Sequence, residues 1–207
     1  DGGMELVTSN DVRAPRVWDI AGSEGKQSVV LYVPLTFPAS KIEGVMVTDF
    51  LTPSADSNCA YPPSLKKEIK NMPRPDIFFD VAVGLAGHKG MNPDELIRKT
   101  YLMTDMQLAL AEKLLLKNQW DLFIAVMLGS DRLQHMFWHH FDETHRRHVK
   151  NSKYKNVLRD YYIYLDKRLG KLLRMLPLKT SIVLVSDHGS GANHARIFIN
   201  KKLAGKN

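Results

Sequence analysis

Short apolar runs alternate along this chain with longer stretches in which apolar residues recur every three or four positions. The short runs are typical of buried strands, and the longer periodic stretches are typical of helices that cover a sheet. Strands are predicted at residues 28–33, 44–49, 76–83, 121–128, 181–185 and 196–199. Helices are predicted at 14–21, 92–117 and 154–175, and a loop at 52–63. This alternation predicts one α/β domain over residues 1–207, with a largely parallel central sheet flanked by helices.

The clearest boundary in the pattern is the start of the second helix. Asn92 can cap the helix, Pro93 suits its first position, and Asp94 and Glu95 place negative charge in its first turn. Leu96, the first apolar residue, opens a series that continues to about residue 117. A long helix is therefore expected here.

Polar side chains that could bind a metal follow two of the predicted strands. Asp131 and His135 belong to the run Gly-Ser-Asp-Arg-Leu-Gln-His at 129–135, and Asp187 and His188 belong to Val-Ser-Asp-His-Gly at 185–189. Ligands of open α/β sheets bind at the carboxyl ends of the strands. Two carboxylates and two imidazoles form a ligand set that suits Zn²⁺ or Mn²⁺. The two motifs therefore predict a metal site.

The spacing within each motif adds to this interpretation. Asp131 and His135 are four residues apart, so on a helix they would lie on one face and could chelate one metal. Asp187 and His188 are adjacent, and in a loop they could serve one metal or two. Taken separately, the first pair is also typical of a solvated helix face, and Asp-His-Gly is also typical of an ordinary turn.

The other histidines are weaker candidates. His139, His140, His145 and His148 are interpreted as surface residues because they stand in a region rich in charged and aromatic side chains. His194 follows the second motif closely and could approach the same site.

Charge and cysteine usage limit the class of protein. The net charge is +7, which favours anionic partners such as phosphorylated small molecules. The basic residues are dispersed, without the interleaved aromatics of an RNA-binding surface, so nucleic acid is not the expected partner. Cys59 is the single cysteine, which excludes a disulfide within the chain and a zinc site built from cysteines. With no apolar run long enough to span a membrane and no signal peptide, we expect a cytoplasmic protein.

Beyond these patterns, the sequence resembles a known family. Ser-Asp-Arg-Leu-Gln-His-Met-Phe-Trp at 130–138, a Tyr-rich helix, and Val-Leu-Val-Ser-Asp-His-Gly at 183–189 resemble the type I phosphodiesterase/nucleotide pyrophosphatase branch of the alkaline phosphatase superfamily. The segments at 14–20, 33–38 and 199–203 are also similar to that branch, so the resemblance covers most of the chain.

The resemblance implies an alkaline-phosphatase-like fold that is incomplete here, with this domain forming part of a larger catalytic domain. It implies two divalent metal ions, zinc or alternatively manganese, and a Ser or Thr nucleophile that attacks phosphorus. By motif match, Asp131 and His135 would bind one metal, and Asp187 and His188 the other. The expected substrate is a small phosphorylated molecule such as a nucleotide.

Some parts of the family pattern have no match. An early Asp, the nucleophile and a third His are expected, yet Asp11 and Thr36 lie in stretches that match other segments, and His194 stands before the final strand. The catalytic residues are therefore unassigned, and activity of these residues alone is not expected. Two alternatives stay open, namely a sulfatase or phosphoglycerate mutase relative, and a non-catalytic α/β binding module that keeps part of the metal site.

Overall fold

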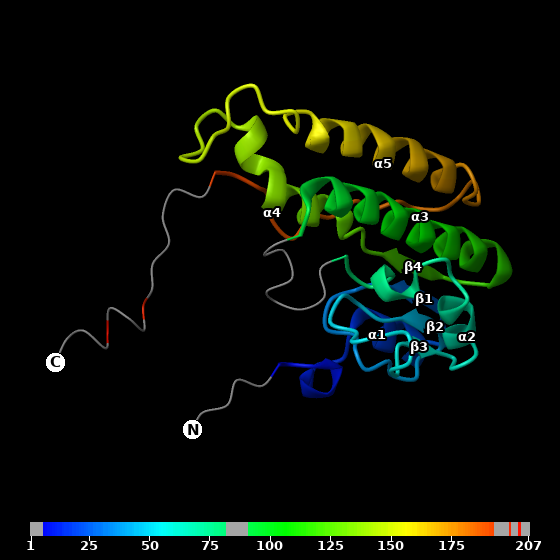
Figure 1. Ribbon diagram of the computed structural model, residues 1–207. Helices are drawn as coiled ribbons and strands as arrows, with labels where there is room; N and C mark the ends of the chain where they lie inside the picture. Colours follow the sequence, from blue (N-terminus) through cyan, green and yellow to red (C-terminus); the bar gives the residue numbers. More distant parts are fainter. Residues whose placement is uncertain (1–5, 82–90, 193–198, 200–202, 204–207) are drawn as a thin grey trace.

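A computed structural model describes residues 6–81 and 91–192 of the chain, together with Ile199 and Leu203. Its helices and strands are interspersed along the sequence, as in an α/β protein (Figure 1). The strands are β1 (Ser28–Leu31), β2 (Gly44–Val47), β3 (Ala60–Tyr61) and β4 (Leu122–Ala125). The α-helices are α1 (Val17–Ser23), α2 (Leu65–Lys70), α3 (Pro93–Lys117), α4 (Gly129–Phe141) and α5 (Val157–Leu173). Two 3-10 turns, η1 (Ser9–Asp11) and η2 (Pro75–Ile77), complete the described elements.

In the described part of the chain, the four strands form one sheet in the order β3-β2-β1-β4. β1 is parallel to both β2 and β4, and the short β3 is antiparallel to β2. The expected largely parallel sheet flanked by helices is therefore confirmed. Because β1, β2 and β4 run the same way, the segments that follow them all leave from one edge of the sheet.

The two faces of the sheet are buried by different helices, as alternation of side chains along a strand requires. Val29 and Leu31 of β1 pack with α2 and with one side of α3. Val30 of β1 and Met46 of β2 pack against Trp18 of α1 on the opposite face. Parallel strands covered on both faces explain why the strand sequences are almost wholly apolar.

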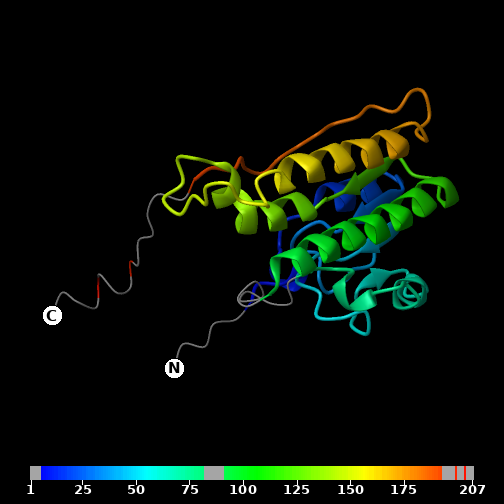
Figure 2. The ribbon, with the colours of Figure 1, turned by 45° about the horizontal axis from the view of Figure 1, so that its top comes forward.

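The opposite side of α3 supports two further helices. Leu96 and Met103 of α3 pack with Phe137 of α4 and Leu165 of α5. In Figure 1, α5 lies on the side of α3 away from the strands, and in Figure 2 the yellow-green α4 lies next to the yellow-to-orange α5. α3 is therefore the central helix, apolar on two sides. It begins at the Asn92 cap as predicted, with the Asn92 side chain accepting the backbone N–H of Asp94 at 2.8 Å.

Several details of the sequence prediction are wrong. Residues 76–83 were expected to form a strand, but 75–77 form the turn η2, and 82–83 lie outside the described residues. The two-residue strand β3 lies in the stretch expected to be loop. β4, expected to be a central strand, has only β1 as a partner among the described strands.

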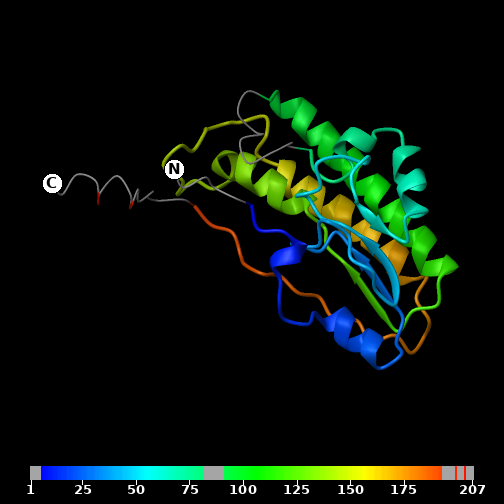
Figure 3. The same ribbon diagram turned by 90° about the horizontal axis from the view of Figure 1, so that it is seen from below.

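The segment at 181–185, expected to be a central strand, shows the largest difference. It has no regular secondary structure, and Leu184 is 92% exposed. Figure 3 shows this orange stretch along the outside of the molecule. The strand expected at 196–199 falls outside the described residues except for Ile199. Within the described part of the chain, none of the helices is long and apolar enough to cross a membrane.

Candidate metal centre

The first motif lies on α4, which starts shortly after β4 ends. Asp131 is in the first turn of this helix, and His135 is one turn further along. The Asp131 Oδ1 and His135 Nε2 atoms are 3.2 Å apart. The side chain of Asp131 is 27% exposed and that of His135 is 65% exposed, so both reach solvent. The expected shared helix face is confirmed.

This separation suits two ligands of one metal. If each atom lies about 2.1 Å from a zinc ion, a separation of 3.2 Å corresponds to an angle of about 100° at the metal, close to the tetrahedral value of about 109°. The distance between the two atoms is therefore compatible with binding of one divalent ion. It supplies two of the three or four protein ligands that zinc sites use.

The second motif lies in the segment that was expected to end a strand. The Asp187 side chain is 89% exposed and that of His188 is 60% exposed, with Asp187 Oδ2 and His188 Nε2 separated by 3.6 Å. The His188 Nδ1 atom is 2.8 Å from the Gly189 carbonyl oxygen, and the Ser186 hydroxyl donates to the His188 carbonyl at 2.6 Å. Local hydrogen bonds therefore define this loop.

Two observations connect the second motif to α4. The Ser190 hydroxyl donates to the side-chain oxygen of Gln134, which lies within the first motif, three residues after Asp131. The hydrogen bond to the Gly189 carbonyl raises the pKa of His188, and the carboxylates of Asp187 and Asp131 raise it further. The His188 ring is therefore within electrostatic reach of Asp131.

The four predicted ligands are not gathered around one point. Among the described residues, no group of three or more His, Cys, Asp or Glu side chains is arranged to hold a metal ion. The structure thus presents two pairs, one on a helix and one in an exposed loop. Assignment of these four residues as metal ligands stays a prediction. His194, the candidate for a third histidine, lies outside the described residues.

Two residues that sequence reasoning did not assign have local structural roles. The Thr36 side chain is fully buried and donates to the Val33 carbonyl at 2.6 Å. Asp11 caps the turn η1, where hydrogen bonds from the backbone N–H and the hydroxyl of Thr8 lower its pKa.

Sequence reasoning missed an ion pair beside the first motif. Arg132 donates from Nε and Nη2 to the two carboxylate oxygens of Asp80, at 2.8 and 2.6 Å. Its Nη1 lies 3.3 Å from Asp131 Oδ2. The side chains of Arg132 and Asp80 are 14% and 9% exposed. The position of Arg132 within the motif could have indicated its role, whereas nothing in the sequence distinguished Asp80 from other aspartates.

The remaining histidines of α4 and the following loop pack on one another. The rings of His139 and His140 have centroids 4.0 Å apart, and His145 lies 5.9 Å from His139. His140 Nδ1 is hydrogen bonded with the Ser152 hydroxyl at 2.8 Å. Burial lowers the pKa of His139 and His140, and neighbouring positive charges lower it further. The sequence predicted a surface role for these histidines, whereas the structure has His139 and His140 half-buried and in contact with each other.

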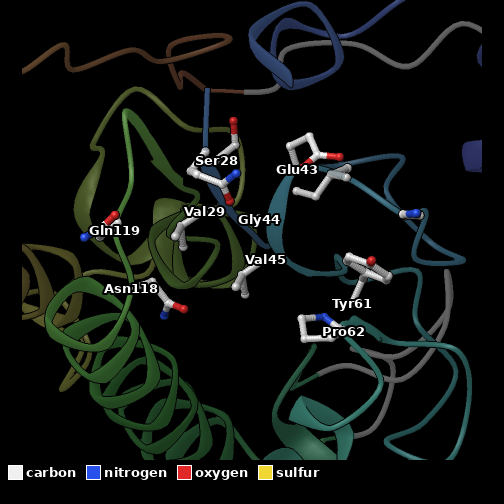
Figure 4. A pocket seen from close by; sticks show the side chains of 12 residues that line it. Ser28, Val29, Glu43, Gly44, Val45, Tyr61, Pro62, Asn118 and Gln119 are labelled. Carbon is white, nitrogen blue, oxygen red and sulfur yellow. The ribbon is translucent and has the colours of Figure 1, made fainter. Parts of the chain in front are cut away.

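A cavity of about 460 Å³ lies at the other edge of the sheet (Figure 4). It is lined by Ser28 and Gly44, at the amino ends of β1 and β2, and by Tyr61 and Asn118. Since the candidate metal residues follow the carboxyl end of β4, this cavity is not part of their site.

Comparison with known proteins places the chain in a class that fits this fold and these motifs. The model of the type I phosphodiesterase/nucleotide pyrophosphatase family matches residues 3–207. The chain therefore belongs to this family, whose name denotes hydrolases of phosphate esters and nucleotide pyrophosphates. No curated protein and no solved structure matches the chain.

Proposed function

We propose that the chain provides metal-binding residues of a hydrolase that cleaves phosphodiesters or nucleotide pyrophosphates. Asp131 and His135 would hold one divalent ion, and Asp187 and His188 the second. Zinc is the expected ion and manganese the alternative, because both accept carboxylate and imidazole ligands. The observation that carries the proposal is the 3.2 Å separation of Asp131 Oδ1 and His135 Nε2, which suits a chelate.

The position of the second pair supports the same proposal. The contact between Ser190 and Gln134 brings the loop of Asp187 and His188 against α4. Family membership over residues 3–207 makes phosphate-ester hydrolysis the expected chemistry. Bound divalent ions would stabilise the charge on the entering and leaving oxygens of the phosphoryl group. The nucleophile is left unassigned.

The residues themselves would act by binding and orientation. The carboxylate of Asp131 would contribute negative charge to the first ion, and the His135 imidazole a neutral nitrogen ligand. His188 must also be neutral to ligate, so its raised pKa makes metal binding compete with protons. The net charge of +7 favours the approach of an anionic phosphate substrate.

Metal content of the intact chain tests this proposal. The protein is dialysed against zinc, and separately against manganese, and the bound metal is measured by elemental analysis. We expect one to two equivalents in the unaltered protein and a clear loss in Asp131→Asn and in Asp187→Asn. Asp166→Asn is the matched control, because Asp166 is an exposed carboxylate on α5 outside both motifs. Equal metal in all four proteins would contradict the assignment.

A second assay addresses the reaction. Release of nitrophenolate from bis(4-nitrophenyl) phosphate, abolished by a chelator and by Asp187→Asn, would support a phosphodiesterase. A folded protein that retains no metal and cleaves neither phosphodiesters, phosphomonoesters nor sulfate esters would favour the non-catalytic binding module.

A further inference from the structure

The ion pair between Arg132 and Asp80 joins two parts of the chain that are distant in sequence. Arg132 is in the first turn of α4, and Asp80 follows η2, 52 residues earlier. Both carboxylate oxygens of Asp80 accept from the guanidinium, at 2.8 and 2.6 Å. Such a two-point contact fixes the plane of the guanidinium as well as its distance.

The surroundings of the pair restrict the arginine further. The two side chains are largely buried, with 14% and 9% of their surfaces exposed. The Arg132 Cζ atom lies 5.2 Å from the centre of the Phe50 ring, a distance at which the cation is attracted by the aromatic face. The guanidinium is therefore held between a carboxylate and a ring, with little freedom to move.

One nitrogen of this fixed group is directed at the candidate metal ligand. Arg132 Nη1 lies 3.3 Å from Asp131 Oδ2, while Asp131 Oδ1 lies 3.2 Å from His135 Nε2. The two oxygens of Asp131 thus have separate partners. Oδ2 is held by the arginine, and Oδ1 is left on the side of the histidine, where a metal would be bound.

We infer that Arg132, held in place by Asp80, is a positioning residue that orients the Asp131 carboxylate for metal binding. The inference rests on the proposed function of Asp131 as a ligand. Groups that hydrogen bond to metal ligands fix their orientation, and their loss typically weakens metal affinity by about 10- to 100-fold. A role for Arg132 in gripping the substrate phosphate is disfavoured, because Nε and Nη2 already donate to Asp80.

The chain offers a matched control for this arrangement. Arg74 donates from Nε and Nη2 to the two oxygens of Asp76, at 2.8 and 2.6 Å. The two pairs thus have the same geometry, but the side chains of Arg74 and Asp76 are 37% and 56% exposed. Arg74→Gln removes the same chemical contact at a site outside the two motifs.

The test measures zinc and manganese affinity of the intact chain by calorimetric titration. Asp80→Asn and Arg132→Gln are expected to bind about 10- to 100-fold more weakly than the unaltered protein, and Arg74→Gln to bind equally well. The absorption spectrum of bound Co²⁺ should change in the first two variants, because it reports the geometry of the ligands. Arg132→Lys keeps the charge but cannot make the two-point contact, so it should remain weakened.

A variant that loses both charges separates positioning from general stability. Arg132→Met combined with Asp80→Leu removes both charges of the pair, so neither is left without the other, and the protein should fold while metal affinity stays low. Unchanged affinity and an unchanged Co²⁺ spectrum in Asp80→Asn would overturn the inference and leave the proposed function standing. Absence of metal from the unaltered protein would overturn both.

Discussion

Gly129, the first residue of α4, should tolerate no side chain. A Cβ atom added there would lie 2.0 Å from the hydroxyl oxygen of Tyr161 and 2.9 Å from Thr104 Oγ1. Tyr161 cannot move away easily, because it is 1% exposed and its ring packs edge-on against Tyr101 at 5.2 Å. Its hydroxyl is also hydrogen bonded with Thr104 at 2.8 Å, and Thr104 in turn donates to the Thr100 carbonyl at 2.9 Å.

The expected cost of Gly129→Ala follows from these contacts. Overpacking of a buried site costs about 1–3 kcal/mol, and a contact at 2.0 Å belongs at the upper end of that range. Alanine is favoured over glycine in a helix by up to about 1 kcal/mol, which opposes part of this cost. We therefore expect a net loss of about 2 kcal/mol in the free energy of unfolding, or about 4–8 °C in melting temperature.

Urea unfolding monitored by circular dichroism measures this loss. Gly170→Ala in α5 is the control, because a Cβ there would meet only Arg174 Nη1, at an ordinary 3.6 Å. Gly170→Ala should stabilise the protein by about 0.5–1 kcal/mol. Tyr161→Phe, combined with Gly129→Ala, should recover part of the loss because it removes the nearest atom. If Gly129→Ala proved as stable as the unaltered protein, the packing described for the start of α4 would be refuted.

Two further predictions concern the exposed segment and the histidine cluster. Leu184→Ala should change the free energy of unfolding by less than about 0.5 kcal/mol because Leu184 is 92% exposed. Leu108→Ala, at a fully buried site, should cost about 2–5 kcal/mol. Comparable losses for the two variants in urea unfolding would show that Leu184 is buried. Burial holds the pKa of His139 and His140 below the usual value of 6.5. As the pH drops, these histidines therefore bind protons in the unfolded protein before they do so in the folded protein, and stability should fall below about pH 6.5. Replacing both histidines with glutamine should flatten the curve of stability against pH between about 7 and 5, and an unchanged slope would contradict the reasoning.

The long helices could be predicted from the sequence because their signals are local. Asn92 and Pro93 mark the start of α3, and the helix ends at Lys117 as expected. The spacing of Asp131 and His135 likewise placed both on one helix face. Each of these features depends on residues within a few turns of one another.

The errors arose where a structure depends on distant partners. An apolar run such as 181–185 suits a strand, but the run alone does not decide whether another strand pairs with it. The strand expected at 76–83 failed for a related reason. Phe78 and Phe79 are buried through edge-on aromatic contacts, Phe78 with Tyr32 and the two with each other, so their apolar character reflects packing without sheet pairing. The contact of Asp80 with Arg132 spans 52 residues and left no local pattern.

The first turn of α4 combines these local and distant constraints, and this bears on how the candidate site is held. Gly129 fixes how closely the helix approaches Tyr161, and Leu133 and Phe137 are buried against the neighbouring helices. A helix fixed at three points on one side cannot rotate about its axis, so the face that carries Asp131 and His135 has a defined direction. Metal ligands on a rigid element need little ordering when they bind. Asp187 and His188 lie in an exposed segment, so on the proposed function their ordering against α4 would limit the affinity of the complete site.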